Sequence, residues 1–95
     1  MADFKTYREK REAELNELKA NLKLMEAKAQ KARAEVKLRL QDDIKKTRKK
    51  IDETSDKLES MKKSSEEKSE ELKKGFEETW KDLKFLYEKT KKNLD

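Results

Sequence analysis

Neighbouring acidic pairs are the residues of this sequence whose chemistry could serve acid–base catalysis or metal binding. Three pairs stand in the C-terminal third: Glu66/Glu67, Glu70/Glu71 and Glu77/Glu78. Adjacent side chains on a helix point about 100° apart, so such pairs diverge instead of converging on one ion or substrate. Catalysis also needs a concave, partly desolvated site, which a rod of helices does not offer. We therefore predict solvated charge and no enzymatic activity.

The sequence has neither histidine nor cysteine. Zinc sites with His or Cys ligands, disulfides, haem ligation and histidine-based catalysis are therefore not expected. We predict no cofactor, no metal and no small-molecule substrate.

A run of basic residues near the middle of the chain has the chemistry to contact anions. Its members are Lys45, Lys46, Arg48, Lys49 and Lys50. Such a cluster can contact phosphates of nucleic acid. Acids at positions 42, 43, 52, 53 and 56 bracket the run, and it contains no aromatic residue for stacking on bases. Weak, non-specific nucleic-acid binding is thus only a second alternative, and nucleic acid is an unlikely partner.

Long amphipathic helices are the elements that would position these side chains. Steps of three and four from Phe4 give one stripe along the whole chain: Phe4, Tyr7, Arg11, Leu15, Leu18, Leu22, Met25, Ala29, Ala32, Val36, Leu40, Ile44, Thr47, Ile51, Thr54, Leu58, Met61, Ser65, Lys68, Leu72, Phe76, Trp80, Leu83, Tyr87, Thr90 and Leu94. There is no proline, and Gly75 is the only glycine. This spacing predicts an all-α fold. With 52% charged and 32% hydrophobic residues, the chain has enough apolar material for a seam between helices.

The spacing predicts a single elongated domain over residues 1–95, most simply an antiparallel helical hairpin or coiled coil that oligomerises. Its helices would span about residues 3–50 and 56–94. The apex could lie at residues 47–51, at residues 53–56 or at Ser64-Ser65, and a continuous helix is a further alternative. Residues 41–61 hold one strongly apolar residue per heptad, so we expect this middle part to pack loosely.

The contacts between helices or between copies are expected where apolar residues are densest. These residues are Leu15, Leu18, Leu22, Met25, Leu72, Phe76, Trp80, Leu83 and Tyr87. A lone hairpin would leave the aromatic side chains of this set partly exposed to solvent, so we predict self-association into a dimer or higher oligomer. Phe85 lies off the stripe and suggests a second contact surface or a chance exposed ring. Gly75 either permits a close helix approach or a bend, or is simply tolerated at about 1 kcal/mol.

Residues 72–94 also support an alternative function, binding to an anionic membrane surface. Leu72, Leu83 and Leu94 repeat at intervals of eleven, a period whose stripe runs almost straight along a helix. The apolar arc has a mixed acidic and basic polar face, whereas a strongly basic face is typical of such binders. The core of a helical assembly is therefore the favoured interpretation of this arc.

Net charge is +5, and the excess lies near the N-terminus. Residues 1–40 carry 11 Lys or Arg against 7 acids. The first residues lack the apolar segment of a secretory signal, and no run reaches the ~20 apolar residues of a membrane span. We expect a cytoplasmic protein.

The C-terminal half contains the segments Leu58-Glu59-Ser60-Met61-Lys62-Lys63, Glu71-Leu72-Lys73-Lys74-Gly75 and Trp80-Lys81-Asp82-Leu83-Lys84, of which the last two are less generic than the rest of this charged chain. Through these segments the chain resembles a family of small bacterial coiled-coil proteins linked to stress responses. Ser69 stands where that family has its first tryptophan. The resemblance implies a stress-associated structural or interaction protein and supplies no mechanism.

Overall fold

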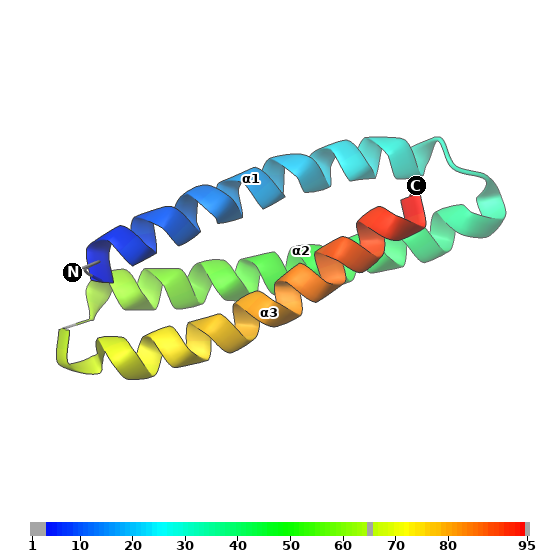
Figure 1. Cartoon of the computed structure of the whole chain (residues 1–95). Coiled ribbons are helices and arrows are strands. Elements are labelled where there is room, and N and C mark those ends of the chain that lie inside the picture. The colour runs from blue at the N-terminus through cyan, green and yellow to red at the C-terminus, as the bar shows by residue number, and fades with distance from the viewer. Residues whose placement is uncertain (1–3, 65, 95) are drawn as a thin grey trace.

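Three long helices make up the fold in a computed structural model, which describes residues 4–64 and 66–94. They are α1 (Phe4–Gln30), α2 (Ala34–Lys63) and α3 (Ser69–Leu94), with a short 3-10 helix, η1 (Glu66–Lys68), before α3. Figure 1 shows them side by side, with α1 and α3 running in one direction and α2 in the other. The bundle measures 51 × 18 × 17 Å. The predicted all-α class is confirmed.

The predicted division into two helices is wrong. The expected helix over residues 3–50 is interrupted at residues 31–33, and α2 then runs unbroken through both apices expected at 47–51 and 53–56. The third expected apex coincides with a real turn, since α2 ends at Lys63 with Ser64 as its C-cap; Ser65 lies outside the described residues. With two turns, α2 is covered by both α1 and α3, so the chain buries more of its own stripe than one hairpin would.

The turn at residues 31–33 forms without glycine or proline. The N–H groups of Lys31 and Ala32 donate to the carbonyls of Lys28 and Ala29, both at 3.1 Å, which closes the last turn of α1. Arg33 is extended (φ −63°, ψ 148°) and precedes α2 without a side-chain cap. This conformation is open to any residue, so no sequence signal marks it.

The stripe forms the core of the bundle. Its buried apolar members are Leu15, Leu18, Leu22, Met25, Ala29, Leu40, Ile44, Ile51, Leu58, Met61, Phe76, Trp80, Leu83 and Tyr87. Phe4, Tyr7, Ala32, Leu72 and Leu94 pack partly buried around them. Among the apolar residues of the stripe, Val36 is the exception, with 41% of its surface exposed.

Buried threonines complete the core where apolar residues are few. Thr47, Thr54, Thr79 and Thr90 are buried, and each donates its hydroxyl hydrogen to the backbone carbonyl four residues earlier. The stripe positions of residues 41–61 are therefore all buried, Thr47 and Thr54 included, because these internal bonds let the hydroxyls enter an apolar layer. The expected loose packing of this part stays a prediction.

Candidate functional site

The residues predicted to make contacts lie inside the single chain. Those on α1 (Leu15, Leu18, Leu22, Met25) and those on α3 (Phe76, Trp80, Leu83, Tyr87) are buried, and Leu72 is partly buried. Phe76 and Leu83 have no exposed surface at all. For the arc of residues 72–94 to reach a lipid surface, α3 would have to leave the bundle. Within the part of the chain that the structure describes, no helix has the length and apolar character needed to cross a membrane.

An aromatic layer joins the first turns of α1 to α3. The rings of Tyr7 and Phe76 meet edge to face at 6.2 Å, and Phe76 stacks on Trp80 at 5.9 Å. The Arg11 guanidinium lies 4.9 Å from the Trp80 ring centre and 5.5 Å from that of Tyr7. The Lys73 ammonium lies 4.7 Å from the Tyr7 ring centre. The negative faces of aromatic rings attract cations. The two cations therefore cover the aromatic layer on its solvent side.

A polar cluster sits on this aromatic layer. The Tyr7 hydroxyl donates to Glu77 Oε1, and Arg11 Nη2 lies 3.1 Å and 3.4 Å from the two Glu77 oxygens. Arg11 Nη1 reaches Glu14, 3.3 Å from each carboxylate oxygen. The cluster therefore ties α1 to α3, and its polar groups largely satisfy one another.

The electrostatics of the cluster follow from burial and from these hydrogen bonds. Burial, together with the hydrogen bond to Glu77, raises the pKa of Tyr7 to about 12. For Glu77, burial favours the protonated form, but the hydrogen bonds from Tyr7 and Arg11 outweigh it and lower the pKa. Glu77 thus stays ionised and Tyr7 stays neutral at neutral pH.

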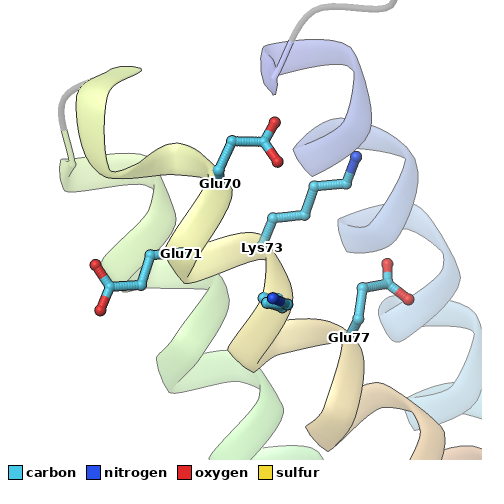
Figure 2. A pocket seen from close by; sticks show the side chains of 5 residues that line it. Glu70, Glu71, Lys73 and Glu77 are labelled. Atoms are coloured by element: carbon cyan, nitrogen blue, oxygen red, sulfur yellow. The ribbon is translucent and has the colours of Figure 1, made fainter.

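A depression of about 490 Å³ lies beside this cluster, at the start of α3. Its lining consists of Glu70, Glu71, Lys73, Lys74 and Glu77. Figure 2 shows Glu70, Lys73 and Glu77 on the side that faces α1, while Glu71 points the opposite way. The divergence predicted for adjacent acids is thus seen at residues 70 and 71. Among the described residues, no group of three or more acids could hold a metal ion.

Two more depressions form a groove between α1 and α3. One, of about 160 Å³, is lined by Glu14, Glu17, Leu18, Asn21, Trp80, Lys84 and Tyr87. The other, of about 210 Å³, is lined by Asn21, Leu24, Met25, Lys28, Tyr87, Lys91 and Leu94. Charge changes sign along this groove. Acids outnumber lysines in the depression of about 160 Å³, whereas the depression of about 210 Å³ has two lysines and no acid among its described lining residues.

The predicted anion contacts at residues 45–50 are largely neutralised. Lys46 pairs with Asp42 at 3.2 Å, Lys50 with Glu53 at 2.8 Å, and Arg48 with Glu26 on α1. Lys45 and Lys49 are exposed and form no ion pair with the residues described. The run therefore offers an anion less charge than its composition suggests.

A second basic segment, around the turn between α1 and α2, was missed in the sequence. Its cations are Lys28, Lys31, Arg33, Lys37 and Arg39, against the single acid Glu35. Within residues 4–64 and 66–94, none of these five cations forms an ion pair. Leu24, Val36 and Leu38 lie in or beside the segment, with 64%, 41% and 75% of their surface exposed. The sequence held one signal for this segment: Leu24 and Leu38 are apolar but do not lie on the stripe.

The fold and groove define the class of protein as a small three-helix bundle with two turns. Comparison with protein-family models, with curated proteins and with solved structures gives no match. Membership of the stress-related coiled-coil family therefore stays a prediction.

Proposed function

We propose that this protein is a non-enzymatic interaction protein, a preformed bundle that self-associates through Leu38 and Phe85, two exposed apolar side chains outside its core. One observation carries the proposal: Leu38 on α2 and Phe85 on α3 are 75% and 69% exposed, while the large apolar residues of the stripe are mostly buried. Single exposed apolar side chains are common on monomers. Here Leu38 and Phe85 are the most exposed of the large apolar residues that the structure describes, because the stripe is mostly covered within the chain.

The charges around the first turns of α2 determine how such association should depend on salt. Lys37 and Arg39 flank Leu38, and Arg33 precedes the helix. Two copies meeting at this segment would bring like charges together, and screening weakens that repulsion at high ionic strength. Self-association should therefore strengthen as salt is added.

Sedimentation velocity over a range of protein concentrations, at low and at high salt, tests the proposal. We expect a monomer–oligomer equilibrium that moves toward the oligomer at high salt. The double variant Leu38→Ser/Phe85→Ser should remain monomeric under the same conditions. Leu24→Ser, a matched control that removes an exposed leucine from the α1–α3 groove, should associate like the unmodified chain.

A chain that stays monomeric in every condition, or a double variant that associates unchanged, would overturn the proposal. A link to stress responses and a cytoplasmic location belong to the proposal as predictions that follow from the sequence alone.

A further inference from the structure

The end of the α1–α3 groove nearest the C-terminus of α3 combines an apolar floor with a basic rim. Leu24, Met25, Tyr87 and Leu94 supply apolar surface to its depression of about 210 Å³. Lys28 and Lys91 supply the charges and Asn21 an amide. Among the described residues that line it there is no acid, so an anion here would meet two cations and, within that part of the lining, no opposing carboxylate.

Both lysines are available to a ligand. Lys28 and Lys91 are exposed, and neither forms an ion pair with any residue the structure describes. Each lies in the last turn of its helix, where the free backbone carbonyls favour a positive side chain. Positive charge is thus favoured at both positions without a carboxylate partner among the described residues, and an anionic group would gain charge-assisted hydrogen bonds from the two lysines.

The apolar floor continues toward the middle of the bundle. The neighbouring depression shares Asn21 and Tyr87 with this one and extends to Leu18 and Trp80. At 1.5 Å per helical residue, Lys91 and Trp80 are about 16 Å apart along α3. The Trp80 end is lined by two acids, Glu14 and Glu17, and by one cation, Lys84. The net charge of the lining therefore changes from basic to acidic along the groove. An anionic amphiphile would be oriented by this change, with its head group at Lys28 and Lys91 and its uncharged chain toward Trp80.

We propose that this groove binds a single-chain anionic amphiphile, a fatty carboxylate whose head group lies between Lys28 and Lys91 and whose alkyl chain lies along Leu24, Tyr87 and Trp80. The shape of the groove favours one narrow chain. Its two depressions, about 210 Å³ and 160 Å³, are each smaller than the roughly 300–1,000 Å³ of pockets that enclose drug-sized molecules. This site involves neither Leu38 nor Phe85, so it goes beyond the proposed self-association.

Titration of the full chain with dodecanoate, kept below its micelle-forming concentration, tests the assignment. Trp80 is the only tryptophan and lines the far end of the groove, so its fluorescence reports on the alkyl chain directly. We expect saturable binding at one site per chain by calorimetry, with a change in Trp80 emission over the same concentration range. Added salt should weaken this binding, the opposite of its effect on self-association.

Two matched double variants isolate the head-group contacts. Lys28→Gln/Lys91→Gln should weaken dodecanoate binding by about tenfold or more, because both charge-assisted contacts are lost. Lys45→Gln/Lys49→Gln removes the same charge from exposed positions on α2 and should change the affinity by less than about twofold. Leu24→Ser should weaken binding while leaving the lysines in place.

Three results would overturn the assignment. One is equal dodecanoate affinity in the two double variants. Another is equal binding of dodecyltrimethylammonium, which has the same chain and the opposite charge. The third is binding to vesicles of anionic phospholipid without binding of dodecanoate, which would make the basic end a membrane-contacting surface and not a site for one molecule.

Discussion

Arg11 on α1 and Glu77 on α3 form an ion pair across the bundle, with Arg11 Nη2 3.1 Å from Glu77 Oε1. The guanidinium also lies 4.9 Å from the ring centre of Trp80, and both charged side chains are only partly exposed, at 21% and 31%. The pair thus links α1 to α3 through two residues that are 66 positions apart in sequence, and it covers the aromatic layer below.

Replacing Arg11 should destabilise the bundle through this double role. Arg11→Ala removes the partner of Glu77 and the cover of Trp80, and we expect a loss of about 1–3 kcal/mol in the free energy of unfolding, measured by urea denaturation. Lys10→Ala, at the exposed neighbouring position, should change stability by less than about 0.5 kcal/mol. Equal stability of the two variants would show that the Arg11 contacts contribute nothing net.

The stability of the bundle should fall at alkaline pH as Tyr7 ionises. Burial and the hydrogen bond to Glu77 raise its pKa from 10.0 to about 12 in the folded protein. The folded state therefore holds the phenolic proton more tightly than the unfolded state. This contribution is fully present below pH 10 and is lost as pH rises through about 12.

Comparison with Tyr7→Phe isolates this effect from the titration of the lysines. The unmodified protein should lose more stability than Tyr7→Phe between pH 10 and 12, and tyrosinate absorbance should show one phenol titrating late. Parallel stability curves for the two proteins would contradict the assignment.

Much of the core follows from the sequence, because the spacing that specifies a helix also specifies its buried face. Leu15, Leu22, Phe76 and Leu83 all lie on the stripe and are all buried. The turn at residues 31–33 does not follow from it. Ala32 continues the stripe in phase, so the same apolar pattern fits an unbroken helix and a bundle equally well.

The groove between α1 and α3 could not be predicted from the sequence without knowing where α3 lies. Tyr7 and Arg11 lie on the stripe by their spacing, but their contacts with Glu77 are 70 and 66 residues away in sequence. Only a fold with two turns sets α1 and α3 parallel and brings these residues together. Spacing within one helix gives no information about such a contact.

Gly75→Ala should stabilise the protein. Gly75 lies inside α3, where glycine costs about 0.5–1 kcal/mol relative to alanine. A Cβ atom added here meets nothing within 4 Å beyond its chain neighbours and the adjacent backbone of α3, so the suggestion of a close helix approach is wrong. The melting temperature should rise; a fall would reveal a constraint on α3 that its surroundings do not show.

A capping residue at position 33 should stabilise α2. Arg33 occupies the N-cap with extended backbone and makes no side-chain hydrogen bond to the helix. Arg33→Ser supplies a hydroxyl acceptor for a free N–H of the first turn and should add about 0.5–1 kcal/mol. Arg33→Ala removes the same charge without adding a cap. The difference in stability between these two variants therefore measures the cap alone, and a difference of zero would contradict it.

Thr47 on α2 and Thr90 on α3 are in contact. Their two hydroxyl hydrogens have three possible hydrogen bonds to fill. Their Oγ1 atoms lie 3.1 Å apart, and each also lies 2.8 Å from a backbone carbonyl of its own helix. Two hydroxyl hydrogens cannot fill three bonds, so one contact is always unmade in a fully buried place. Thr47→Val/Thr90→Val should therefore raise the free energy of unfolding by about 1 kcal/mol, because methyl groups replace both hydroxyls without leaving a polar partner unpaired.

Thr47→Ala should instead cost about 1 kcal/mol or more through the cavity it leaves. Urea denaturation measures both variants. A destabilised double valine variant would mean that the hydroxyl pair stabilises this packing of α2 on α3.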